Sequence, residues 1–298
     1  MDPFNDSGEL VNIHTAFTQA QYTSVINDYS PSDFSSSNRL ACQILQYRAQ
    51  CALGQYDPVI GSISDSDARS TPGLAAARTY ASYLQRPSDA AVSEAERLAE
   101  SQGDNLSVQI LCGTILARAG NEEAAIALLS KHTGSLDAVA LIIQVHLQQN
   151  RLDLATKEAK SARNFAQDAL LVNLAESWIG MRKGGEEYQK AFYVFEELAQ
   201  GASSQSASSL VAQAVSEMHL GRSEEAEAAL SQALGLEPEN TAAAANLWVL
   251  ETIAGRDATK SRERLEKLDK EHDLLSELDA KREAFQLAVA KYSPKFEP

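Results

Sequence analysis

The sequence predicts an all-α fold, a solenoid of repeated helical hairpins. Its 298 residues include only 15 Gly and 8 Pro, aromatic residues make up 6%, and alanine is abundant. This composition favours helices over sheets. Small or apolar residues recur about every 34 positions, and a turn residue precedes most of them by five positions. One hairpin cannot bury its apolar face alone, so stacked hairpins must share a continuous core.

The repeat is clearest where residues 120–130 align with residues 221–231, an offset of 221 − 120 = 101, or about three units of 34. Equivalent positions between and beyond these segments form one column of residues: Val25, Val59, Ala91, Ala125, Ala155, Ala191, Ala226 and, weakly, Lys260. The residue four places after each column member lies on the same helix face. These two positions predict the inward seam of the second helix in each hairpin.

Turn residues separate the two helices of most units. They are Gly54, Gly120, Asn150, Gly221 and Gly255, with Gly185 one place out of register. Glycine and asparagine tolerate the left-handed backbone that ends one helix before the next begins. Two units depart from the pattern, since Ala20 takes this place in the first and Arg86-Pro87 replaces it before Ala91.

We expect about eight hairpins across residues 6–270, followed by one further helix over residues 273–292, within a single domain of residues 1–298. The last segment carries an apolar stripe formed by Leu274, Leu278, Phe285, Ala288 and Tyr292. Such a stripe is typical of an amphipathic helix that caps the last repeat. The polar, serine-rich residues 203–209 are predicted to be a loop between repeats and no domain linker.

The best-formed unit, residues 210–240, has an apolar-periodic first helix, Gly221 at the turn, Ser223 as the expected N-cap and Pro238 at its end. This pattern resembles the tetratricopeptide repeat, whose period is 34 residues. The resemblance implies a tetratricopeptide-like α-solenoid, a right-handed superhelix of helix-turn-helix repeats with a concave groove.

Sequence motifs for catalysis and cofactor binding are missing. There is no P-loop, G-x-G-x-x-G, H-E-x-x-H or G-x-S-x-G motif, and the five histidines are scattered. Cys42, Cys51 and Cys112 form no close pair, so we expect reduced, buried thiols. We therefore predict no enzyme, no cofactor and no metal site. Paired glutamates such as Glu122-Glu123 are assigned to helix termini, while an α-toroid hydrolase using Glu176 is kept as an alternative.

Charge and hydropathy limit the partners. The chain has 26 Lys and Arg against 41 Asp and Glu, a net charge of −15, which disfavours nucleic acid. The most apolar stretch, residues 136–147, is too short to cross a bilayer, and the first residues have no signal-peptide pattern. We expect a cytoplasmic protein without direct membrane insertion.

The first helices of the repeats supply the predicted concave surface. Counted from the same register, the groove residues are Ile44, Arg48, Cys51, Tyr80, Tyr83, Ile110, Gln144, Leu147, Val211, Val215 and Met218. These residues are apolar and aromatic, with Arg48 as the one cation among them. This surface suits a segment of another protein that buries hydrophobic side chains.

Seven segments carry a further resemblance: residues 1–10, 10–28, 51–63, 140–160, 186–200, 219–247 and the tail ending in residues 291–296. They are similar to the epsilon subunit of coatomer, the COPI vesicle coat. The resemblance implies a non-catalytic coat component in the cytoplasm and, peripherally, on Golgi membranes and COPI-coated vesicles. It would act in Golgi-to-ER retrograde and intra-Golgi transport and would bind and stabilise the C-terminal region of the alpha subunit through its concave surface.

A generic tetratricopeptide adaptor or co-chaperone that binds a peptide segment is the alternative. Clamping an acidic peptide tail requires several cations in the groove, and the predicted register supplies only Arg48 and Lys183.

Overall fold

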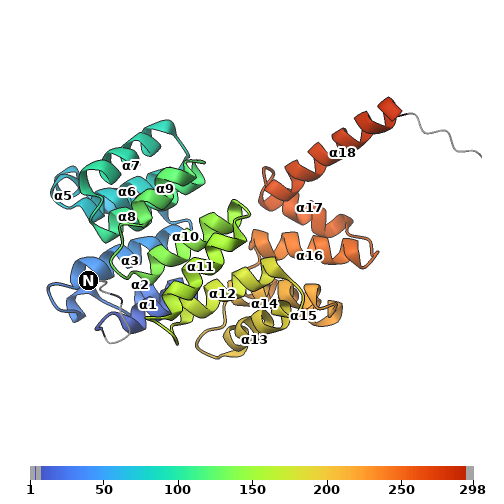
Figure 1. Cartoon of the computed structure of the whole chain (residues 1–298), viewed down its shortest axis with the longest axis horizontal. Coiled ribbons are helices and arrows are strands. Elements are labelled where there is room, and N and C mark those ends of the chain that lie inside the picture. The colour runs from blue at the N-terminus through green and yellow to red at the C-terminus, as the bar shows by residue number, and fades with distance from the viewer. Residues whose placement is uncertain (1–3, 5–7, 293–298) are drawn as a thin grey trace, which may run out of the picture. The chain divides into compact units, whose positions relative to one another are not determined.

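The computed structural model describes residue 4 and residues 8–292, and every regular element in this part of the chain is a helix. The chain divides into two compact units, Met1–Ser204 and Gln205–Pro298. Figure 1 shows the helices of each unit in antiparallel hairpins. The predicted all-α fold class is therefore confirmed. The single-domain organisation stays a prediction, and residues 6 and 7 at the predicted start of the array lie outside the described residues.

The first unit contains thirteen described α-helices and one 3₁₀ helix. They are α1 (Val11–Thr18), α2 (Tyr22–Asn27), η1 (Pro31–Asp33), α3 (Arg39–Ala52), α4 (Tyr56–Ser62), α5 (Asp65–Ser70), α6 (Pro72–Gln85), α7 (Asp89–Gln102), α8 (Leu106–Arg118), α9 (Glu122–Leu129), α10 (Leu136–Gln148), α11 (Leu152–Arg163), α12 (Leu170–Lys183) and α13 (Glu187–Gln200). The first helices contact one another in succession, α1 with α3, α3 with α6, α6 with α8, α8 with α10 and α10 with α12. Helix α1 also contacts α12. The first helices therefore surround a common interior.

The second unit contains α14 (Ala207–His219), α15 (Ser223–Leu236), α16 (Thr241–Ile253), α17 (Thr259–Leu268) and α18 (Asp273–Tyr292). Helix α14 packs on α15 and α16 packs on α17. The boundary between the units falls inside the serine-rich segment, where the Ser206 hydroxyl caps α14 by accepting from the Ser209 backbone N–H. The N-cap of α15 is Arg222, one residue before the predicted Ser223.

The repeat column forms the inward seam in the well-matched units. Val25, Val59, Ala125, Ala155, Ala191 and Ala226 are at most 1% exposed. Alanine at these places lets two helices approach closely without leaving a void. Two units are exceptions. Ala91 is only half-buried, and in the last unit Lys260 is exposed while Ser261 and Leu265 are buried. The predicted register there is wrong by one residue.

The turn residues adopt the predicted conformation. Gly54, Gly120, Asn150, Gly221 and Gly255 have φ angles between 57° and 83°. Ala20 also has a φ of 60°, so an alanine occupies the left-handed region at the first turn. At Arg86 the chain is instead extended, as the following proline requires.

Helix α18 covers the predicted range, but most of its apolar stripe is uncovered. Leu275 is buried, whereas Phe285 is 70% and Tyr292 is 71% exposed. The predicted packing of these two aromatic residues on the last repeat is wrong. Only the start of α18 is held against its unit.

Candidate interaction site

A cavity of about 450 Å³ lies inside the ring of first helices in the first unit. Its walls come from α1, α2, α3, α4, α6, α8 and α10. Residues four apart on one helix face the same side, so Tyr80 and Leu84 both line the cavity from α6. The cavity therefore results from aligned stripes on successive first helices.

The cavity brings together several residues predicted to face the groove. Arg48, Cys51, Tyr80, Ile110 and Gln144 all line it. Gln144 is solvent-exposed, whereas Ile110 is only 4% exposed and forms part of a wall. These positions on α3, α6, α8 and α10 share one interior surface.

Other predicted groove residues lie elsewhere. Ile44 lines a smaller cavity of about 110 Å³, whose walls also include Arg48 and Ile110. Tyr83 and Leu147 are 7% and 9% exposed and pack in the core. Tyr83 follows Tyr80 by three residues, so the helical rotation turns it about 60° away from Tyr80.

Three predicted groove residues belong to the second unit. Val211, Val215 and Met218 are half-buried on α14. Their role in partner binding stays a prediction.

Several cavity residues were not predicted from the repeat register. They are Phe17, Tyr22, Ala52, Tyr56, Leu84, Leu111, Thr114, Arg118 and Leu141. Extending the stripe by four and eight residues from Ile110 would have found Thr114 and Arg118. No spacing in the sequence predicts Phe17 and Tyr22 of the first hairpin, because they line the cavity only when α1 packs against later repeats.

The cavity walls combine aromatic rings, apolar side chains and cations. Burial raises the pKa of Tyr80, although Arg48 and Arg118 act in the opposite direction. Burial also raises the pKa of the Cys51 thiol to about 11, so this thiol is neutral at physiological pH. Arg118 makes no ion pair within the described part of the chain. These groups can bind a peptide by apolar burial and hydrogen bonds.

A buried charge cluster holds α1 and α3 against α10. His14 Nε2 donates to Asp137 Oδ2 over 2.7 Å, and Arg48 Nη2 donates to Asp137 Oδ1 over 2.9 Å. Side-chain exposures are 12% for His14, 15% for Arg48 and 8% for Asp137. Burial would raise the pKa of Asp137, but Arg48 and His14 outweigh burial and hold this pKa below its usual range. The cluster is therefore an ionised contact between distant repeats.

Aromatic rings cover this charge cluster. The Phe4 ring stacks on His14 with centroids 4.7 Å apart, and the Arg48 guanidinium lies 4.5 Å from the centroid of Phe17. A cation over an aromatic face is attracted by the ring's electron density. Phe17 thus links the charge cluster to the wall of the cavity.

Acidic residues proposed for catalysis have structural partners. Glu176 accepts two hydrogen bonds from Arg163, at 2.7 and 2.6 Å. Glu122 and Glu123 lie in the first turn of α9, as predicted for residues that interact with the helix dipole. No group of three or more metal-ligating side chains occurs among the described residues. Nor does any described helix combine the length and apolarity that crossing a bilayer needs.

The family model for the coatomer epsilon subunit matches residues 6–293. The chain belongs to the coatomer epsilon subunit family. It is 28% identical over 291 residues to coatomer subunit epsilon-1 of Arabidopsis thaliana, covering 95% of this chain and 97% of that relative. It is 30% identical over 254 residues to a probable coatomer subunit epsilon of Schizosaccharomyces pombe, covering 85% and 83%. The resemblance found in the sequence is thus confirmed along nearly the whole chain.

Solved structures confirm the repeat class of this family member. One chain in the crystal structure of the APC/C hetero-tetramer Cut9–Hcn1 superposes with a TM-score of 0.61 at 15% identity, covering 90% of this chain and 54% of that one. A tetratricopeptide repeat protein from Parabacteroides merdae gives a TM-score of 0.59 at 11% identity, covering 87% and 97%. At these identities the likeness establishes the fold alone, a tetratricopeptide-like α-solenoid.

Proposed function

We propose that this chain is a non-catalytic structural subunit of the COPI coat that binds the C-terminal region of the coatomer alpha subunit. The interior surface of its repeat array supplies the binding site. This subunit acts in Golgi-to-ER retrograde and intra-Golgi transport, in the cytoplasm and peripherally on Golgi membranes and coated vesicles. Its attachment to the membrane runs through the other coat subunits.

The observation that carries this proposal is the open cavity lined by the first helices. Its volume of about 450 Å³ and its wall of Tyr22, Tyr56, Tyr80 and Ile110 suit a few large side chains of a partner segment. Aromatic walls are favourable anchors for buried interface residues. Family membership supplies the coat to which that partner belongs.

Filling the cavity tests the proposal. Gln144 is exposed and lines the cavity, so Gln144→Trp adds bulk there without altering the core. Gln200→Trp is the matched control, because Gln200 is an exposed glutamine at the end of α13 and outside the cavity. This pair is cleaner than Ile110→Asp, which would bury a charge in a helix-packed wall.

Each variant is co-expressed with the C-terminal region of the alpha subunit, and the co-purified stoichiometry is measured. We expect Gln144→Trp to lose most of the captured partner and Gln200→Trp to keep it, with the same thermal melting for both. Full capture by Gln144→Trp would move the binding site away from this cavity. Loss of capture by both variants would also contradict the assignment.

A further inference from the structure

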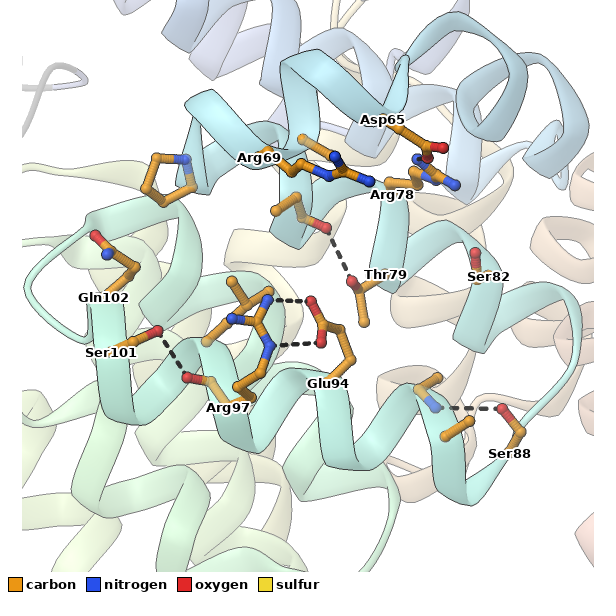
Figure 2. Close-up of a pocket in the computed structure, with 16 residues that line it drawn as sticks. Asp65, Arg69, Arg78, Thr79, Ser82, Ser88, Glu94, Arg97, Ser101 and Gln102 are labelled. Carbon is orange, nitrogen blue, oxygen red and sulfur yellow. Dashed lines mark hydrogen bonds and ion pairs between the residues drawn. The ribbon is translucent and has the colours of Figure 1, made fainter.

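A second groove, of about 600 Å³, lies between α5, α6 and α7 of the first unit. It shares no lining residue with the interior cavity. Figure 2 shows Arg69 and Arg78 on one side of its opening, with Arg97 and Glu94 on the facing helix. Three guanidinium groups from three different helices thus meet around one groove.

Most guanidinium donors in this groove are available to a ligand. Arg78 Nη1 donates to Asp65 Oδ1 over 2.5 Å, and Arg97 donates from Nε and Nη2 to Glu94 over 2.8 and 2.6 Å. Arg69 makes no ion pair with any residue that the structure describes. Since each guanidinium carries five N–H donors, most of those donors can still meet another carboxylate.

The two existing pairs are easily rearranged because they are exposed. The Asp65 side chain is 73% exposed, and Glu94 is 39% exposed. Ion pairs in contact with water contribute little to stability, so sharing Arg78 or Arg97 with an incoming carboxylate costs little. The hydroxyl groups of Thr79 and Ser101 already donate to backbone carbonyls of their own helices. The arginines therefore supply the charged donors of this groove.

The shape of the groove suits an extended peptide. Its lining includes the small side chains of Ala68, Ala75 and Ala91, which leave room for a backbone. Lining residues on α7 run from Ala90 to Gln102, a length of about 18 Å along the helix. This length accommodates about five residues of an extended strand.

The charge of the groove is opposite in sign to the net charge of the whole chain. The groove has three arginines and two carboxylates among its lining residues, whereas the chain has a net charge of −15. We propose that this groove binds an acidic segment of another polypeptide, whose carboxylates contact Arg69, Arg78 and Arg97. This binding site is separate from the interior cavity and does not depend on the function proposed for that cavity.

Fluorescence anisotropy with the full chain and a labelled decapeptide of alternating Glu and Ala tests the proposal. We expect saturable binding that weakens as salt rises, and at least tenfold weaker binding of the same peptide with Gln in place of Glu. Arg69→Ser combined with Arg97→Ser should weaken binding of the acidic peptide at least tenfold. Arg151→Ser is the matched control, because it removes an exposed arginine that pairs with Asp153 outside the groove. The affinity of Arg151→Ser for the acidic peptide should stay within twofold of the affinity of the original chain.

The other outcomes overturn the proposal. Absence of binding to the acidic peptide, equal binding of the Gln peptide, or unchanged binding by the double variant would each do so. Binding only when phosphoserine replaces Glu would assign the groove to a phosphorylated segment instead. Circular dichroism checks the fold of the double variant. If the double variant unfolds, the single variant Arg69→Glu replaces it, because Arg69 is exposed on α5. Arg69→Glu should then weaken binding of the acidic peptide at least tenfold, and unchanged binding would overturn the proposal.

Discussion

His14 Nε2 lies 2.7 Å from Asp137 Oδ2, although 123 residues separate the two positions in the sequence. Repeats in an open solenoid contact only their neighbours. Here the first hairpin reaches the first helix of a much later one, and α1 also contacts α12. The interior of the first unit is therefore enclosed by a contact between distant repeats.

Removing the shared carboxylate should be costly. Asp137→Ala leaves the Arg48 guanidinium without its buried partner, and we expect a loss of about 3 kcal/mol in the free energy of unfolding. Asp153→Ala, which breaks the exposed pair with Arg151, should cost much less, because water screens that pair. Denaturant unfolding followed by tryptophan fluorescence measures both. Equal losses for the two variants would show that the cluster does not support the enclosed arrangement.

Low pH should remove the stabilisation that the ionised Asp137 carboxylate provides. The folded-state pKa of Asp137 is lowered from its ordinary value of 3.8, so its stabilisation is present above that pH and is lost as the pH falls below it. The stability difference between the original chain and Asp137→Asn should shrink as the pH falls below about 4. Unfolding curves at pH 7, 5, 4 and 3 provide the measurement. A difference that grows in acid would contradict the assigned pKa direction.

Replacing the alanine at the first turn with glycine should increase the stability of the chain. Because Ala20 holds a φ of 60°, Ala20→Gly relieves left-handed strain and should stabilise the chain by about 0.5 to 1 kcal/mol. Gly120→Ala should lose a similar amount, since Gly120 has a φ of 83° and free space around it. Ala119→Gly is the control at a negative φ and should lower stability slightly. Thermal melting that ranks Ala20→Gly below the original chain would refute the strain argument.

Two helical glycines should respond in opposite directions to alanine. A Cβ at Gly113 of α8 would lie 2.9 Å from Leu129 Cγ, so Gly113→Ala should cost about 1 to 3 kcal/mol through overpacking. Gly61 of α4 has no neighbouring atom within 4 Å of such a Cβ. Gly61→Ala should therefore stabilise by about 0.5 to 1 kcal/mol. Melting temperatures of the two variants should move apart, and a shared direction would contradict this packing.

Local periodicity was sufficient to predict the hairpins. The column from Val25 to Ala226, apart from the half-buried Ala91, and the left-handed turn residues follow from spacing alone, because both patterns repeat within about 34 residues. The predicted register is wrong by one residue in the last unit, where Ser261 and Leu265 are buried, and this unit has the weakest sequence pattern. Helix α5 was missed because it is a short insertion between two regular hairpins.

The enclosure of the cavity could not be predicted in the same way. Register placed Arg48, Tyr80, Ile110 and Gln144 on one interior surface. The contribution of Phe17 depends on the charge cluster of His14 and Asp137, and no repeat period relates those two positions. Long-range pairing of single charged residues leaves no trace in local spacing.

The charge cluster also has a consequence for synthesis on the ribosome. His14 and Arg48 are made well before Asp137, and at about 5 to 20 residues per second the 123-residue interval takes about 6 to 25 s. During that wait the charge cluster that joins the first hairpin to α10 cannot form. The rate of translation between these positions therefore sets the earliest moment at which this long-range contact can form.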